Sequence, residues 1–589
     1  MTTTASVHDV PATETAPTVG RFLATRLVQL GARHLFGLPG DFNLTLLDEM
    51  LTQEDLTWVG STNELNASYA ADAYARVGRR LGALVTTYGV GELSAVNGMA
   101  GSFAEDVPVL HIAGMPSRAS MDQKVPLHHT VLDGDFDHTV RIAAEFSTAH
   151  AVLGPDNAAR EIDRVLTAML TTSKPGYIGI PLDVAAAPIT EHIDLAAPAT
   201  APTRPDALAA FEKALVQHVQ GTHATLLVGP RVHRRGLEPV VRRIADLPGV
   251  LVASQSASKA VLDEQHPASL GTYLGSTTRE ERTRDLVDTA QLLIMVGTIT
   301  SDFTTGFFSH RYDTATAVEL GLDTARIGHA HYPGVLLEDS LAALERVVTA
   351  AQLPEAPTGP TAMGEAGAKS RGDGAAGDDV DDADDEAPSP GPEDALDQTV
   401  LWKRIQDWIA PATTVIAEAG TSFYGALDLH LPEDSDLLGQ PVWSSIGYTL
   451  PAVLGAGLAR PERRPVLFIG DGSAQLTISE LGLVYRHVPG AVIVLIENRG
   501  YTVERCIQSP EAVYQDVLAW DWPAIPAALG APQVRTPRAR TVGELDAALA
   551  DIAAQPEQSY LLTFDLPVMD APRLLRILAE GISRTNSRS

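Results

Sequence analysis

Short hydrophobic runs alternate with segments of helical periodicity along most of the chain. In the first third, the runs that read as strands lie at residues 34–40, 56–62, 82–89 and 176–184. Further runs of this kind lie at residues 224–229, 249–255, 291–297, 324–330, 413–420, 464–472, 491–500 and 560–568. Segments of helical pattern such as 43–51 and 64–77 separate them. Because strands that alternate with helices pair in parallel through crossover connections, the pattern predicts an α/β fold of doubly wound parallel sheets.

Chain length and local composition predict three such domains. The chain has 589 residues, several times the length of one domain. Residues 354–396 combine Pro, Gly, Ala and acidic residues with almost no large apolar side chain, so we expect a disordered acidic linker there. The rest divides into a flexible N-terminus at 1–18, a first domain at 19–190, a middle domain at 200–353 and a third domain at 397–589 that ends in a helix.

The first and third domains end in a similar way. Both GYIGIPLDVAAAP, from residue 176, and SYLLTFDLPVMDAP, from residue 559, contain a strand followed by an aspartate and a proline. This similarity between the two segments favours a shared fold for the two domains. The alternative is that the likeness is incidental, because any α/β domain can finish on a strand.

Composition restricts the classes of partner. Apolar residues make up 45% of the chain and charged residues 20%, as in globular proteins. The formal net charge of −31 repels phosphate backbones and anionic lipids, so we expect no nucleic acid and no membrane partner. The single cysteine, Cys506, excludes an internal disulfide framework, and the N-terminus lacks the pattern of a signal peptide. We therefore expect a cytoplasmic protein.

The most informative stretch is residues 466–500, which contains a strand, a Gly-Asp-Gly-Ser turn, an amphipathic helix and a second strand. Asp471 and Asn498 then lie just past the carboxyl ends of two parallel strands, where open α/β sheets bind ligands. A carboxylate and an amide oxygen are hard ligands suited to Mg²⁺, and the carbonyl of Gly500 is a candidate for the third protein ligand.

The turn itself is suited to a diphosphate. Gly470 and Gly472 let the backbone approach a bulky anion, and Ser473 lies near a helix N-terminus whose free N–H groups suit phosphate. Taken alone, however, the sequence Gly-Asp-Gly-Ser is common in ordinary turns.

The spacing of this motif is more specific. Asp471 precedes Asn498 by 27 residues, and a glycine follows two residues later. This arrangement resembles the metal and diphosphate motif of thiamine-diphosphate enzymes. The resemblance implies that Asp471, Asn498 and the Gly500 carbonyl hold Mg²⁺ bound to thiamine diphosphate. It makes the third domain the diphosphate-binding domain and the first the pyrimidine-binding domain.

A second segment matches the same family. Glu64 stands between the expected strand 56–62 and a helix, in a sequence that resembles the family's glutamate segment. The resemblance implies that Glu64 contacts the aminopyrimidine ring and that it reaches the site of a neighbouring subunit. A homodimer at minimum, and a homotetramer as the full assembly, are implied. The simpler alternative is an acid favoured by the helix dipole.

Further segments are similar to the pyruvate and indolepyruvate decarboxylase group. Asp41 in LPGDFN, the pair His128 and His129 in LHHTVLDGDF, and Glu504 in GYTVERCIQSP match residues that handle proton traffic in that group. We expect Glu504 to be partly buried and therefore protonated. The resemblance implies non-oxidative decarboxylation of a 2-oxo acid to an aldehyde and CO₂ through a thiamine ylid and enamine.

The same likeness indicates how cofactor and substrate are held. Ile446 matches the family's apolar wedge, which bends the cofactor. The other expected cofactor contacts are Gly420, Thr421, Ser422, Gly470, Gly472 and Ser473. The expected substrate pocket comprises Ala419, Phe423, Tyr424, Val503, Leu578 and Ile582. Because pyruvate-selective relatives tend to have Trp at the position of Phe423 and on the final helix, a wider pocket for branched-chain or aromatic 2-oxo acids is favoured over pyruvate.

Two other functions compete with this interpretation. An acetolactate synthase-type carboligase shares the Gly-Asp-Gly-Ser motif and Glu64, but it usually lacks the histidine pair. A non-catalytic scaffold on the same fold is the alternative from a different class. Nicotinamide binding through GVGELS at 89–94 is disfavoured because the third glycine of the dinucleotide motif is absent.

Overall fold

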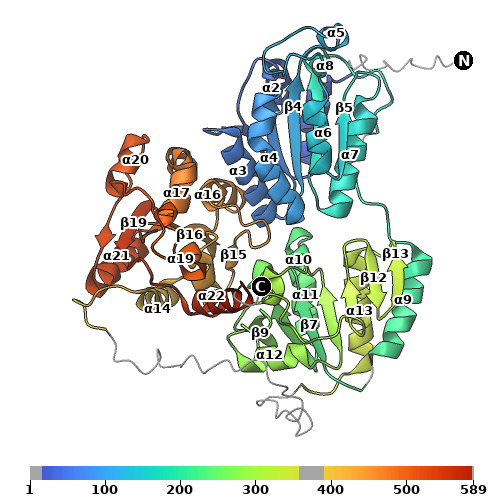
Figure 1. Ribbon diagram of the computed structural model, residues 1–589. Helices are drawn as coiled ribbons and strands as arrows, with labels where there is room; N and C mark the ends of the chain where they lie inside the picture. The colour runs from blue at the N-terminus through green and yellow to red at the C-terminus, as the bar shows by residue number, and fades with distance from the viewer. Residues whose placement is uncertain (1–15, 195, 220, 357–389, 587–589) are drawn as a thin grey trace, which may run out of the picture.

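The chain folds into three α/β domains, which Figure 1 shows in blue to teal, green to yellow, and orange to red. The structure is a computed structural model that describes residues 16–194, 196–219, 221–356 and 390–586, with side chains up to residue 580. Most of the expected linker, residues 357–389, and most of the expected flexible N-terminus, residues 1–15, lie outside the described residues.

The first domain has a parallel sheet of six strands in the order β2-β1-β3-β4-β6-β5. Its strands are β1 (His34–Gly37), β2 (Thr57–Gly60), β3 (Gly82–Thr87), β4 (Val109–Met115), β5 (Ala149–Val152) and β6 (Gly176–Pro181). Its helices are α1 (Val19–Gln29), α2 (Leu44–Met50), α3 (Glu64–Gly78), α4 (Val90–Ala104), α5 (Arg118–Asp122), α6 (His138–Glu145), α7 (Ala158–Thr172) and α8 (Leu182–Ala185). Strands β3, β4 and β6 are buried throughout because helices cover both faces of the sheet.

The third domain repeats this topology, with the strand order β15-β14-β16-β17-β19-β18. Its strands are β14 (Thr413–Ala417), β15 (Asp436–Leu438), β16 (Arg464–Gly470), β17 (Val492–Glu497), β18 (Arg538–Ala539) and β19 (Tyr560–Asp565). Its helices are α14 (Gln398–Trp408), α15 (Thr421–Leu427), α16 (Thr449–Ala459), α17 (Asp471–Thr477), α18 (Leu481–His487), α19 (Thr502–Ile507), α20 (Ile525–Ala528), α21 (Val542–Ala554) and α22 (Arg573–Asn586). The expected fold similarity of the first and third domains is therefore confirmed.

The middle domain has a sheet of seven strands in the order β13-β12-β11-β10-β7-β8-β9. Its strands are β7 (Ala224–Val228), β8 (Val250–Ser254), β9 (Ser269–Thr272), β10 (Leu293–Val296), β11 (Val318–Leu320), β12 (Thr324–Ile327) and β13 (Ala330–Pro333). Its helices are α9 (Pro205–His218), α10 (Arg231–Arg234), α11 (Glu238–Ala245), α12 (Glu281–Asp288) and α13 (Leu337–Ala351). Short 3₁₀ helices in the middle and third domains are η1 (Ser256–Ser258), η2 (Phe303–Thr305), η5 (Ile478–Glu480), η6 (Val513–Gln515) and η7 (Trp522–Ala524).

One expected strand runs in the opposite direction. The sequence predicts residues 324–330 as another parallel strand, but β12 pairs antiparallel with both β11 and β13. The link from β11 to β12 is a tight turn in which the Gly321 N–H donates to the Thr324 carbonyl at 2.8 Å. A turn this short returns the chain antiparallel, because a parallel partner needs a long crossover.

Helices α3 and α16 join the first and third domains, and Figure 1 shows them side by side. A Cβ on Gly455 would lie 2.0 Å from the Ala70 carbonyl oxygen, so only glycine allows this close approach. Buried residues of both helices, including Tyr69, Tyr74 and Val453, belong to one hydrophobic cluster. The two domains therefore share a core across this contact.

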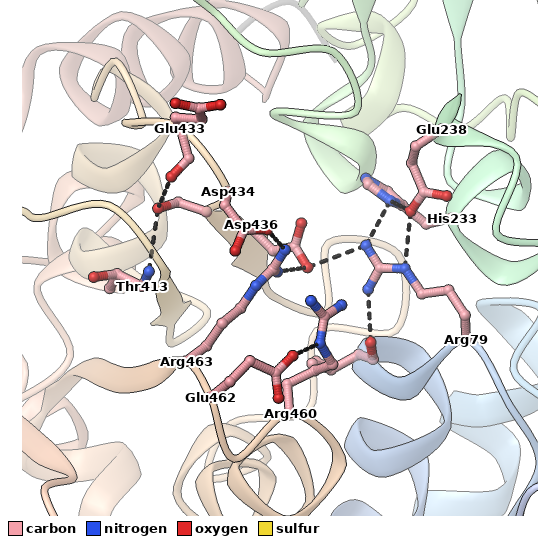
Figure 2. A network of polar contacts seen from close by, with 12 residues as sticks. Arg79, His233, Glu238, Thr413, Glu433, Asp434, Asp436, Arg460, Glu462 and Arg463 are labelled. Carbon is pink, nitrogen blue, oxygen red and sulfur yellow. Dashed lines mark hydrogen bonds and ion pairs between the residues drawn. The ribbon is translucent and has the colours of Figure 1, made fainter. Parts of the chain in front are cut away.

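All three domains meet at Arg79, at the C-terminal end of α3, as Figure 2 shows. The Arg79 guanidinium donates to Glu238 of the middle domain at 2.8 Å and to Asp436 of the third domain at 3.0 Å. Arg463 also donates to Asp436, at 2.5 Å. Burial would raise the pKa of Asp436, but the nearby Arg79, His233 and Arg463 hold it well below its ordinary value.

Replacing Arg79 by Met is expected to weaken the joint between the domains. The change leaves Glu238 and Asp436 without a shared cation in a poorly solvated position, at a cost of about 3 kcal/mol. For a cooperative unit of roughly 150–250 residues this lowers the unfolding midpoint by about 6–12 °C in a thermal scan. The control is Arg243→Met, which removes an exposed ion pair with Glu345 inside the middle domain and should cost about 1 kcal/mol or less. Equal shifts for the two variants would contradict a special role of Arg79.

Candidate active site

Three oxygen atoms converge past the carboxyl ends of β16 and β17. Asp471 is the first residue of α17, and Asn498 directly follows β17. The Asn498 side-chain oxygen lies 2.9 Å from the Gly500 carbonyl oxygen and 3.2 Å from Oδ1 of Asp471. Its NH₂ group donates to Oγ1 of Thr502 at 2.9 Å. Adjacent ligands at about 2.1 Å from an octahedral Mg²⁺ are about 3.0 Å apart, so the spacing of these oxygens suits this ion.

The opposite orientation of the Asn498 amide would satisfy the same three groups without a cation, because its NH₂ group would then donate to both oxygens. Asp471 itself is buried, which raises the pKa of its carboxyl to about 6. The backbone N–H groups of Arg499 and Gly472 donate to it at 2.8 Å and oppose that rise. A bound cation would favour the ionised carboxylate and the oxygen-inward amide together.

A cavity of about 220 Å³ opens beside these oxygens. Most of the expected cofactor and pocket residues line it, namely Ala419, Gly420, Thr421, Ser422, Tyr424, Ile446, Gly470, Gly472, Ser473, Asn498, Gly500, Val503 and Glu504. The buried Ser422 hydroxyl has no hydrogen-bond partner among the described residues, so it is available to a ligand. A Cβ on Gly472 would lie 2.7 Å from the Tyr501 ring, which explains the second glycine of the turn.

A smaller pocket of about 60 Å³ shares Ala419, Gly420 and Tyr424 with this cavity. Phe423 lines it and is almost fully buried. Its ring centroid lies 5.7 Å from that of Phe303, which comes from η2 of the middle domain. Sequence reasoning missed Phe303, because no local pattern indicates that this loop reaches the third domain.

The two residues expected on the C-terminal helix fit the pocket less well. Leu578 is buried in the hydrophobic cluster of the third domain and does not appear in the lining of either cavity. Its side chain therefore packs behind the pocket and does not face it. Ile582 lies on α22, but its side chain is beyond the described side chains.

A second polar group lies in the first domain. The Nε2 atom of His128 is 2.9 Å from Asp41, and Nε2 of His129 is 3.9 Å from the other oxygen of the same carboxylate. The Phe42 ring stacks on His128 with a centroid distance of 5.1 Å. The structure thus brings together Asp41, His128 and His129, and all three are exposed in the single chain.

Glu64 and Glu504 differ in their surroundings. Glu64 begins α3 and is half-buried beside Gly91, and it is absent from the lining of the cavity in its own chain. Glu504 lines the cavity but is exposed, so the expectation of partial burial is wrong for the single chain. In the short helix α19, Thr502 and Arg505 are the inward-facing positions, which leaves Glu504 at the mouth of the cavity.

Glu418, at the end of β14, is a site residue that sequence reasoning missed. It lines the cavity and its side chain is almost fully buried. Burial raises the pKa of Glu418 to about 7, and hydrogen bonds from Thr449 and Gly447 oppose the rise. Its place directly after a strand was the available signal, since Asp471 follows β16 in the same way.

No helix in the described part of the chain has the length and apolar content needed to cross a bilayer.

Three family models match the chain. "Thiamine pyrophosphate enzyme, N-terminal TPP binding domain" covers residues 17–139, "Thiamine pyrophosphate enzyme, central domain" covers 215–347, and "Thiamine pyrophosphate enzyme, C-terminal TPP binding domain" covers 420–562. Similar curated proteins include three named alpha-keto-acid decarboxylase. The one from Mycobacterium ulcerans is 39% identical over 97% of both chains. That of Mycobacterium tuberculosis is 40% identical over 95% of this chain and 96% of its own. That of Mycobacterium leprae is 38% identical over 98% of this chain and 97% of its own.

Proposed function

This chain belongs to the thiamine pyrophosphate enzymes and decarboxylates 2-oxo acids, and we propose that it uses Mg²⁺, prefers branched-chain or aromatic acids and acts as a homodimer at minimum. The observation that carries the proposal of a Mg²⁺-dependent enzyme is the set of converging oxygens of Asp471, Asn498 and Gly500 beside the cavity. A cytoplasmic location is also proposed, in keeping with the single cysteine.

The residues around the cavity fit thiamine diphosphate. Asp471, Asn498 and the Gly500 carbonyl would hold a Mg²⁺ ion bound to the diphosphate, and the Ser422 hydroxyl is free to donate to the cofactor. When bound, thiamine diphosphate supplies the carbon nucleophile that adds to the ketone and accepts the electron pair released as CO₂ leaves. Ile446 projects into the same cavity and is 40% exposed there.

The remaining proton transfers require acidic residues and histidines that a single chain does not bring to one site. Glu504 is at the cavity, whereas Glu64 and the Asp41, His128 and His129 group lie on the first domain. We propose that Glu64 of the partner subunit exchanges a proton with the aminopyrimidine ring. Asp41 and the histidines would then face Glu504 across the interface and deliver the proton that the product aldehyde requires.

Exposed hydrophobic side chains support this assembly. On the first domain, Val131 and Leu132 are 70% and 65% exposed, and they begin two residues after His129. On the third domain, Val513, Tyr514 and Leu518 are at least 71% exposed, close to Gly500 in space because Gly500 bridges to Asp516. Such apolar groups next to functional residues are typical of a covered interface. A homotetramer, which the family resemblance implies, would pair two such dimers.

The assay that tests the function measures CO₂ release from a panel of 2-oxo acids, with thiamine diphosphate and Mg²⁺ present. Release of CO₂ with a matching amount of aldehyde is the expected result. Acetolactate as the main product, or a bound flavin, would instead indicate the carboligase. No turnover of any acid by a chain that binds the cofactor would favour a scaffold.

Replacing Phe423 by Trp is expected to shift selectivity toward pyruvate. A Cβ on Gly439 would lie 2.3 Å from the Phe423 ring, so the space on that side is closed and a larger ring must enter the pocket. Overpacking of this kind costs about 1–3 kcal/mol, which lowers kcat/KM for phenylpyruvate relative to pyruvate by about one to two orders of magnitude.

The measurement compares kcat/KM for phenylpyruvate, 2-oxoisovalerate and pyruvate, because their ratios cancel general damage. Phe211→Trp is the matched control, since Phe211 is buried in the core of the middle domain and the ratios should not change. An equal loss for all three acids in Phe423→Trp would show that Phe423 is not a wall of the substrate pocket.

A further inference from the structure

The loop between β15 and α16 carries Ile446 into the cofactor cavity, and its first half is held by the first domain. The Glu105 carboxylate accepts from the backbone N–H groups of Val442 and Trp443 at 2.8 and 3.1 Å. The Trp443 indole N–H donates to Asn97 at 2.9 Å. Several hydrogen bonds to the first domain therefore hold this half of the loop in place before Ile446.

Beyond Ile446 the loop is held from within the third domain, chiefly by Glu418. One carboxylate oxygen of Glu418 accepts from the Gly447 N–H at 3.2 Å. The other accepts from the Thr449 hydroxyl at 2.5 Å and from the Thr449 N–H at 3.3 Å. The Thr477 hydroxyl donates to the Gly447 carbonyl at 2.8 Å. Glu418 thus bonds to residues one and three positions after Ile446.

We infer that Glu418 is a positioning residue, which anchors this loop to the end of β14 and so holds Ile446 against the bound cofactor. The inference rests on the proposed function, because it assigns Glu418 a task in the same cavity. A buried carboxylate that accepts three hydrogen bonds is costly to place, and its removal leaves buried backbone donors without an acceptor. The hydrogen bonds of Glu418 therefore restrain this part of the loop and keep the apolar side chain of Ile446 in position.

The charge state of Glu418 gives the role a measurable signature. The ionised carboxylate accepts from all three donors, whereas a protonated one has to use one oxygen as a donor. Burial raises the pKa of Glu418 to about 7. Burial also raises the pKa of the neighbouring Tyr69 to about 12, with smaller contributions from the charges of Glu418 and Asp72. Tyr69 therefore stays neutral near pH 7, and we expect the anchor to weaken as the pH falls through about 7.

The free energy of unfolding depends on pH in the opposite direction. The folded state binds the Glu418 proton more tightly than the unfolded state, so Glu418 lowers the free energy of unfolding as the pH rises from about 4.5 to about 7. A glutamine at this position does not titrate. Glu418→Gln should therefore remove this part of the pH dependence.

The test uses the full chain with thiamine diphosphate and Mg²⁺, and compares Glu418→Ala, Glu418→Gln and Ile446→Ala. In Glu418→Ala we expect proton exchange at the thiazolium carbon to slow by about 10–100-fold, while the Kd for the cofactor changes by less than about tenfold. Glu418→Gln should recover part of the rate and lose the fall near pH 7. Glu264→Gln is the control, because Glu264 is a buried carboxylate away from the cavity, which accepts from the Leu431 N–H and also pairs with Lys259.

A double variant separates positioning from general damage. If Glu418 acts through Ile446, Glu418→Ala should slow exchange little further in the Ile446→Ala background. Losses that multiply in the double variant, or a Glu264→Gln effect equal to that of Glu418→Gln, would overturn the inference. Amide hydrogen exchange at residues 440–449 gives a readout independent of turnover, even in a chain that binds no cofactor. Faster exchange at Gly447 and Thr449 in Glu418→Ala is expected, and unchanged exchange there would also overturn the inference.

Discussion

Replacing Asp471 by Ala is expected to abolish the retention of thiamine diphosphate. The proposed metal site loses its carboxylate, and the two remaining neutral oxygens are a poor set for Mg²⁺. We expect the Kd for the cofactor with Mg²⁺ to rise by at least about a hundredfold. The thermal stabilisation by the cofactor, about 2.7 kcal/mol at a hundred times the wild-type Kd, should fall to about 0.4 kcal/mol or less under the same conditions.

Isothermal titration and a thermal scan with and without cofactor and Mg²⁺ measure both effects. Asp565→Ala is the matched control, since Asp565 ends the neighbouring strand β19 but pairs with Arg538 and does not line the cavity. An unchanged cofactor Kd in Asp471→Ala would rule out the metal assignment.

Replacing Glu64 by Gln is expected to leave cofactor binding intact and to lower turnover by about 10²–10⁴, the usual contribution of a positioned acid or base. The amide preserves the shape of the side chain but cannot take up or release a proton at pH 7. Proton exchange at the thiazolium carbon is the direct measurement. Exchange at the wild-type rate would refute the role of Glu64.

Complementation tests where Glu64 acts. Co-expressed Glu64→Gln and Asp471→Ala chains form mixed dimers in which one site combines an intact Glu64 with an intact Asp471, if the two residues come from different subunits. Random pairing then restores about a quarter of the wild-type activity. If both residues serve the site of their own chain, every site keeps one defect and the mixture stays inactive.

Features that depend on local order along the chain could be predicted from the amino-acid sequence. The βαβ pattern and the spacing of Asp471 and Asn498 predict that these two residues lie close together, because parallel strands joined by a crossover end at the same edge of a sheet. The alternation of strand and helix in the first and third domains likewise predicts their parallel sheets.

Features that depend on contacts between distant segments are visible only in the folded chain. The approach of Phe303 to Phe423, the exposure of Glu504 and the packing of Leu578 behind the pocket are set by how domains and helices dock. In the sequence, Glu418 is one of many residues that follow a strand. Its role is visible only in the folded chain, where Gly447 and Thr449 of the loop with Ile446 donate hydrogen bonds to it. Such contacts join residues that are separated by long stretches of chain, and they are chosen by shape and burial, which hydrophobic periodicity does not encode.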